Sequence, residues 1–151
     1  MNSRGFTLME ILIVSALVAI ISLGGYLSLV NYRKNQDLGL TSGKIVSFLR
    51  DAQAKAVAQE DAQQWGVRFD NTGEGSIQLF NGPSFDIAES TFRIPRAVQF
   101  TDPSSGNTKD VVFSKITGEP NAATIITLSL ASDPTATKTV TINAQGTITE
   151  E

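Results

Sequence analysis

The sequence predicts an α+β protein in which one long N-terminal helix packs on a C-terminal antiparallel β-sheet domain. The first observation is an apolar run without any charge from Ile11 to Tyr32. The second is an apolar spacing of three and four residues directly after that run, which is typical of an amphipathic helix. The third is a change after Gln64 to short alternating segments separated by Gly, Pro, Asn and Asp, which is typical of strands and turns.

The apolar run is long enough to cross a membrane as a helix. About 22 helical residues rise roughly 33 Å, and the hydrocarbon core of a bilayer is about 30 Å thick. Cations flank both sides, with Arg4 before the run and Arg33 and Lys34 after it, so they do not set its orientation. A cleaved secretory signal is the alternative, but its apolar region is about 7–15 residues and ends in a small-residue cleavage site. We therefore expect a transmembrane half of the helix over residues 6–32.

The helix is expected to continue as an amphipathic segment over residues 33–62, ending near Glu60. Apolar residues recur on one face of this segment, at Leu38, Ile45, Phe48, Leu49, Ala52 and Ala56. Polar residues such as Lys44 and Arg50 fill the gaps between them. The apolar stripe predicts packing against a sheet.

Residues 63–151 are expected to form one β-rich head. Trp65, Val67 and Phe69 alternate with polar residues, Asn71–Gly75 reads as a turn, and Ile77, Leu79 and Phe80 suggest the returning strand. Further strands are expected at Val98–Thr101, Val111–Phe113, Ile125–Leu130, Thr139–Ile142 and Thr147–Thr149. A head of this size can bury its own core without dividing into two domains.

The composition excludes several classes of function. The chain of 151 residues has no histidine and no cysteine, so it lacks the commonest general base, the commonest zinc ligand and any disulfide. The formal charge is −3, which provides no overall attraction for nucleic acid. No G-x-S-x-G motif occurs. We expect neither an enzyme nor a bound cofactor.

Glu10 needs an explanation, because a carboxylate beside a membrane helix is costly unless it reaches water or a cation. One interpretation is a capping box, in which Thr7 caps the helix and Glu10 reaches back to it. The other is a pair with a cation on a second subunit. If the chain were cut after Gly5, Phe6 would carry a new α-amino group that a neighbour's Glu10 could bind. Buried pairs of this kind define register better than they add stability.

The segment GFTLME followed by an apolar helix resembles the N-terminus of type IV prepilins, the family of type IV pilins and type II secretion pseudopilins. The resemblance implies that residues 1–5 are a leader peptide, that prepilin peptidase cuts between Gly5 and Phe6, and that Phe6 is then N-methylated. It also implies that Glu10 forms an assembly salt bridge. Many members have a proline partway along this helix, whereas this chain has Gly24 and Gly25 there and no proline before Pro83.

The C-terminal segment resembles the last sheet of H-class minor pseudopilins and T-type minor pilins. The residues that carry this resemblance are Phe113, Gly118, Leu128, Val140, Ile142, Gly146 and Ile148. An ordinary β-meander produces similar alternation, so both interpretations remain open. The resemblance implies partners among other (pseudo)pilin subunits and an inner-membrane assembly platform. It implies a single-pass inner-membrane protein with its C-terminal domain outside the cytoplasm, in a periplasmic or cell-surface filament after assembly.

Other candidate sites are weaker. Asp70, Asn71 and Glu74 could bind calcium from a loop, but they lack EF-hand spacing and suit a plain turn. Asp102 and Asp110 lie on either side of a PSSGN loop and are likewise interpreted as turn residues rather than a calcium site. Arg93 and Arg96 lie near Phe92 and could contact DNA, but a solvated strand edge is the favoured explanation. At the C-terminus, Glu150 and Glu151 carry negative charges, which oppose contacts with phosphates. The sequence therefore favours a structural (pseudo)pilin subunit of the minor class; a major subunit and a DNA- or client-binding minor pilin are the alternatives.

Overall fold

The computed structural model describes the backbone of residues 7–151 and their side chains except for 23–28. One α-helix, α1, spans Leu8–Val57, and a short 3₁₀ helix, η1, spans Glu60–Ala62. The chain divides into two compact units, Met1–Lys34 and Asn35–Glu151, which are described separately. The predicted cleavage site at Gly5 and Phe6 lies outside the described residues, and so do the surroundings of Gly24 and Gly25.

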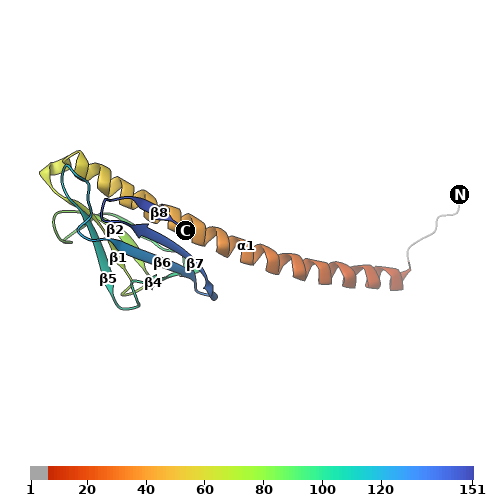
Figure 1. The fold of residues 1–151 in the computed structure, drawn as a ribbon. Coiled ribbons are helices and arrows are strands. Elements are labelled where there is room, and N and C mark those ends of the chain that lie inside the picture. Colours follow the sequence, from red (N-terminus) through yellow and green to blue (C-terminus); the bar gives the residue numbers. More distant parts are fainter. Residues whose placement is uncertain (1–6) are drawn as a thin grey trace. The chain divides into compact units, whose positions relative to one another are not determined.

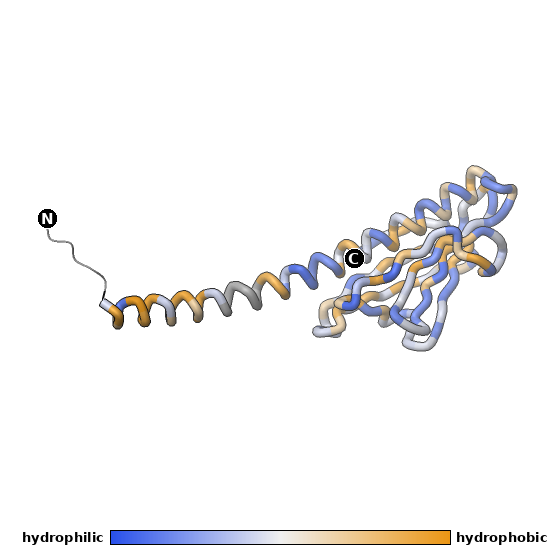
Figure 2. Tube along the Cα trace, turned by 180° about the vertical axis from the view of Figure 1, so that it is seen from behind, coloured by the Kyte–Doolittle hydropathy of each residue, from blue (hydrophilic) through white to orange (hydrophobic). Residues whose placement is uncertain are grey.

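The described part of the first unit is the N-terminal half of α1, and its side chains are mostly apolar (Figure 2). Ten large apolar side chains between Leu8 and Ile21 are 52% to 79% exposed. Among the described residues, no helix has both the length and the apolar character needed to span a membrane. The predicted span 6–32 includes Phe6 and residues 23–28, which lie outside this description, so the span remains a prediction.

The second unit contains the rest of α1 and two four-stranded antiparallel sheets (Figure 1). The first sheet has the order β3-β2-β1-β5 and the second has the order β4-β6-β7-β8. Their strands are β1 (Trp65–Asp70), β2 (Ser76–Asn81), β3 (Ala88–Arg93), β4 (Val98–Asp102), β5 (Thr108–Phe113), β6 (Thr124–Leu130), β7 (Asp133–Ile142) and β8 (Ile148–Glu150). The predicted α+β fold is confirmed, and the structure adds the division of the strands into two sheets.

One core joins the second half of α1 to both sheets. The six apolar positions predicted to form the helix stripe, from Leu38 to Ala56, are all buried. The first sheet contributes Val67, Phe69, Ile77 and Val111 to the same cluster, and the second contributes Phe100, Ile126, Leu128, Val140 and Ile142. The rings of Phe69 and Phe100 meet edge to face across the two sheets, with centroids 6.1 Å apart, a favourable geometry for aromatic pairs.

Three differences from the expected elements have identifiable causes. The helix ends at Val57 rather than near Glu60, because Gln59 takes a left-handed conformation with φ 56°. Strand β3 was not expected, because AESTFR lacks apolar alternation; it forms by pairing with β2 at the edge of its sheet. Strand β7 begins at Asp133, six residues before the predicted start, because it pairs with the full length of β6.

Candidate functional site at the start of the helix

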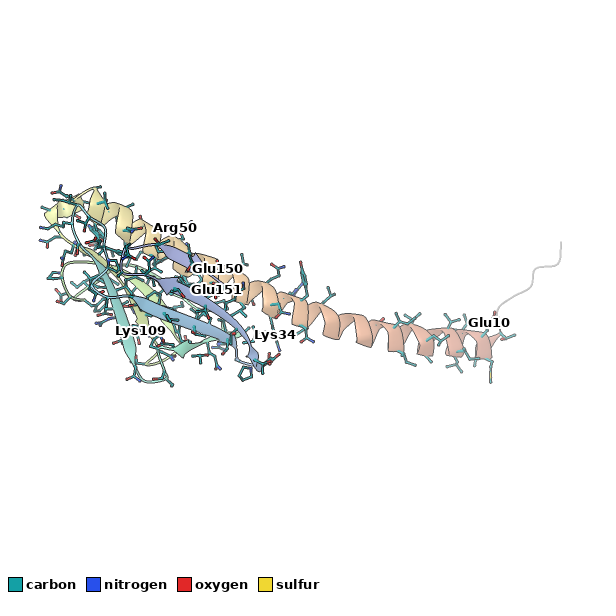
Figure 3. The ribbon with its side chains drawn as sticks, in the orientation of Figure 1. Glu10, Lys34, Arg50, Lys109, Glu150 and Glu151 are labelled. Atoms are coloured by element: carbon teal, nitrogen blue, oxygen red, sulfur yellow. The ribbon has the colours of Figure 1, made fainter. Side chains whose placement is uncertain are left out.

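The predicted assembly residue Glu10 lies in the first turn of α1 (Figure 3). Thr7 precedes the helix as its N-cap. The Glu10 backbone N–H donates to the Thr7 Oγ1 at 3.2 Å and to the Thr7 carbonyl at 3.1 Å. This is the threonine half of a capping box. Within residues 7–151 as described, the Glu10 carboxylate takes part in no salt bridge.

The local sequence explains why the helix begins here. A threonine side chain accepts a bond from one of the N–H groups that the first turn leaves without a helical partner. An acidic residue in the first turn also interacts favourably with the positive end of the helix dipole. The cap therefore uses the backbone N–H of Glu10, and within residues 7–151 the Glu10 carboxylate has no cation as a partner.

The remaining candidates in the head have structural partners. Asp70 Oδ1 accepts bonds from the Thr72 hydroxyl at 2.7 Å and the Thr72 N–H at 2.8 Å. These bonds lower the pKa of Asp70 below its usual range. Asn71 donates its side-chain amide to the carbonyls of Phe100 and Pro103. These contacts belong to a turn, and the described residues contain no group of three or more His, Cys, Asp or Glu arranged to hold a metal ion.

A small cavity of about 280 Å³ lies beside this turn, lined by Asp70, Thr72, Gly73, Glu74, Gly75, Ser76 and Arg93. Arg93 ends the edge strand β3, and the Arg96 guanidinium lies 3.7 Å from the Glu74 carboxylate, with both side chains mostly exposed. The local arginines thus share their surroundings with two carboxylates. This arrangement matches a solvated strand edge better than a phosphate-binding surface.

The other two candidate carboxylates, Asp102 and Asp110, form ion pairs between strands. Arg68 on β1 donates to both oxygens of Asp110 on β5, at 2.7 and 2.6 Å, and these bonds to Asp110 raise the pKa of Arg68. The Arg68 guanidinium also lies 4.0 Å from the centre of the Phe85 ring. Asp102 pairs with Lys109, which is labelled on β5 in Figure 3. Both carboxylates stabilise the sheets.

One contact between α1 and the C-terminal turns was not predicted from the sequence. The Gln53 side-chain amide donates to the carbonyls of Gly118 and Gly146, each at 3.0 Å. Both glycines have positive φ, 68° and 79°. The two glycines belong to the pattern that carries the resemblance to minor pilins, but a glutamine in a helix surface pattern has no distinguishing signal.

Comparison with known proteins agrees with both parts of this description. Residues 1–26 match the prokaryotic N-terminal methylation motif, and no curated protein matches the chain. The fold is similar to the type IV minor pilin FimU of Pseudomonas aeruginosa, at 12% identity and a TM-score of 0.59, covering 80% of this chain and 92% of FimU.

The fold is also similar to the minor pseudopilin EpsH from the type 2 secretion system of Vibrio cholerae. The identity is 13% and the TM-score 0.56, with 76% of this chain and 96% of EpsH covered. At these identities the likeness shows a shared fold. The two relatives are filament-type subunits by name and not enzymes. The chain therefore combines a prokaryotic N-terminal methylation motif with a fold similar to that of a minor pilin and a minor pseudopilin.

Proposed function

We propose that this protein is a minor subunit of a type IV pilus or a type II secretion pseudopilus. It would be made as a single-pass inner-membrane precursor, with its C-terminal domain outside the cytoplasm, and would then enter a filament through its N-terminal helix. The observation that carries this proposal is the methylation motif over residues 1–26, which includes the start of a helix whose large apolar side chains are exposed between Leu8 and Ile21. Such a surface needs lipid or other helices to cover it.

Maturation is the first step to test. Prepilin peptidase would cut between Gly5 and Phe6 and methylate Phe6. We expect mass spectrometry of the protein from native membranes to find an N-terminal peptide that begins at methylated Phe6. Gly5→Leu should leave the leader attached, whereas Asn2→Ala, a change within the leader but away from the junction, should be processed normally. An intact Met1 in cells with active peptidase would refute the pathway.

Glu10 is proposed as the residue that selects the position of the next subunit. Thr7 bonds the backbone N–H of Glu10, and the described residues give the Glu10 carboxylate no salt bridge, so this carboxylate could pair with the Phe6 amine of a neighbouring subunit. Breaking a buried ion pair costs about 3–5 kcal/mol, so Glu10→Gln should reduce incorporation into filaments at least tenfold, by about 1.4 kcal/mol or more. Cleavage at Gly5 should be unchanged. Thr7→Ser keeps the cap and is the matched control; normal filament yield from Glu10→Gln would remove this role.

Minor rather than major status is supported by the fold, which resembles two subunits named as minor. Quantitative mass spectrometry of sheared filaments should find this chain at a small fraction of the most abundant subunit. If it is itself the most abundant subunit, it is a major pilin. The inner-membrane assembly platform remains a predicted partner, and co-purification with it would test that contact.

DNA or client binding is the alternative role. The arginines near β3 have carboxylates close by, and the C-terminal strand ends with Glu150 and Glu151. Both features oppose phosphate contacts. A mobility-shift assay with the full-length protein in detergent, over a salt series, should show no binding at physiological salt; a salt-dependent shift that Arg93→Ala removes would favour the DNA role.

A further inference from the structure

A single exposed isoleucine in the loop between β5 and β6 has a strained backbone. Ile116 has a φ of 71°, in the left-handed region, where a β-branched residue is a true outlier. The Thr117 N–H donates to the Lys115 carbonyl at 2.8 Å, which closes a three-residue turn with Ile116 at its centre. Turns of this kind with a positive φ are rare and strained.

The surrounding bonds explain how the strain is held. The Ile116 N–H donates to the Ala56 carbonyl near the end of α1, at 3.3 Å. The Lys115 ammonium donates to the Ala62 carbonyl at 3.1 Å. The Ser114 N–H donates to the Glu119 carbonyl at 2.8 Å, and the Gly118 N–H returns to the Ser114 carbonyl at 3.0 Å. The loop is therefore fixed from both sides, as strained residues must be in order to persist.

Folding does not explain why this position holds isoleucine. Its side chain is 65% exposed, so it gains little from burial in the head. Asparagine or glycine would adopt the same φ with less strain. Val57, at the end of α1, is 46% exposed. It lies beside the same loop, because one of its methyl groups is only 2.7 Å from the position that a Cβ on Gly118 would take. Strain combined with an exposed apolar side chain points to a contact outside the chain.

We propose that Ile116 and Val57 together form an anchor, the loop anchor, that inserts into an apolar pocket on a neighbouring subunit of the same fibre. This inference rests on the proposed filament role. A rigid turn that projects an apolar side chain fits a concave protein surface, and a few well-packed side chains carry most of the energy of an interface.

The charges around the loop anchor favour a protein over a membrane or nucleic acid. Lys55 pairs with Glu60 at 2.7 Å, Lys115 precedes Ile116, and the side chains of Asp61 and Glu119, on the adjoining segments, are exposed. Mixed charges with an acidic excess are suited to the polar rim of a protein interface. They would oppose contact with anionic lipid or with phosphates.

The test compares Ile116→Asn with the matched control Ile87→Asn in the full-length protein. Ile87 is also highly exposed, at 73%, but is not among the described residues with positive φ. Ile116→Asn should raise the Tm of the protein in detergent by about 3 °C or more, because strain is relieved. It should also lower incorporation into fibres at least tenfold, while Ile87→Asn changes neither quantity in this way.

A photo-reactive residue at position 116 identifies the partner. A covalent product with another fibre subunit supports the inference. Three results would overturn it: no rise in Tm for Ile116→Asn, normal incorporation of that variant, or cross-links to lipid alone. Failure of the loop anchor can be told apart from failure of the proposed function. If the wild-type chain is never matured at Phe6 and never found in fibres, the filament role is refuted. If the wild-type chain is matured and assembled and its Ile116→Asn variant also assembles normally, only the loop anchor is refuted.

Discussion

Gln53 shows how one side chain can hold two distant turns. Its amide donates to carbonyls that lie 65 and 93 residues further along the chain. Gln53→Ala should lower the free energy of unfolding by about 1–3 kcal/mol, because two half-buried carbonyls lose their donor. Chemical denaturation of the full-length protein in detergent would measure the change. Gln63→Ala, at an exposed position, should change the free energy of unfolding by less than about 0.5 kcal/mol. Equal effects of the two variants would contradict a stabilising role for the two Gln53 hydrogen bonds.

At Ser42 we predict the opposite effect, a substitution that raises the free energy of unfolding. Its side chain is fully buried on α1, and its hydroxyl lacks a hydrogen-bond partner among the described residues. A buried hydroxyl without a partner costs about 1–3 kcal/mol, so Ser42→Ala should stabilise the protein by about 1 kcal/mol. Ser47→Ala on the exposed face of the same helix controls for helix propensity. A Ser42→Ala variant no more stable than the Ser47→Ala variant would indicate that the hydroxyl is satisfied.

At the scale of an element, the turn between β7 and β8 depends on glycine. Gly146 has a φ of 79°, and a Cβ there would lie 2.5 Å from the Gln53 amide nitrogen and 2.7 Å from the Gly118 oxygen. Gly146→Ala should therefore destabilise the head by about 2 kcal/mol or more, through strain and lost contacts. Gly73→Ala is the control, because a Cβ there would have no neighbour within 4 Å. Thermal melts would compare them; similar Tm values would contradict the packing described.

The turn after β1 provides a pH-dependent prediction. Hydrogen bonds from Thr72 lower the pKa of Asp70 from its ordinary value of 3.8. A carboxyl group with a lowered folded-state pKa adds stability above its unfolded pKa, and that stability is lost as pH falls through the folded value. Thr72→Val removes the hydroxyl bond, so it should lower the Tm at pH 7 and have less effect near pH 2. Thr91→Val on β3 is the control, and a Thr72→Val deficit that is unchanged at low pH would exclude the ionised carboxylate as its cause.

At the scale of the whole molecule, the shared core predicts a single unfolding transition for the head. The second half of α1 and both sheets contribute to one cluster of buried residues. Trp65, the only tryptophan, is buried at the start of β1, so its fluorescence reports on the first sheet. Its denaturant midpoint should coincide with the loss of β-sheet signal in circular dichroism.

The variant Phe100→Ala, on the second sheet, tests whether the two sheets unfold together. Phe100 is buried and meets Phe69 of the first sheet, so the variant should lower the unfolding free energy by about 3–5 kcal/mol. It should move the midpoints of both probes together. If only one midpoint moved, the sheets would be separate cooperative units.

The sequence by itself determined the N-terminal motif, the long helix and most of the strands. The apolar spacing from Leu38 to Ala56 identified the buried face of α1, and the alternation in Trp65, Val67 and Phe69 identified β1, because these periods follow from local backbone geometry. Thr7 and Glu10 were recognisable because capping acts over three residues. The N-terminal motif was likewise readable, because all of it lies within one short segment.

Only the tertiary structure decided how these elements meet. Strand β3 has little apolar alternation and exists because β2 offers it a partner. Gln53 reaches Gly118 and Gly146 only when the sheets have folded against α1. Ile116 reads as an ordinary isoleucine in sequence, and its positive φ results from bonds to Ala56 and its own loop. Strand pairing, the Gln53 hydrogen bonds and the strained turn at Ile116 all depend on groups far apart in the chain. No local pattern encodes which of those groups will come together.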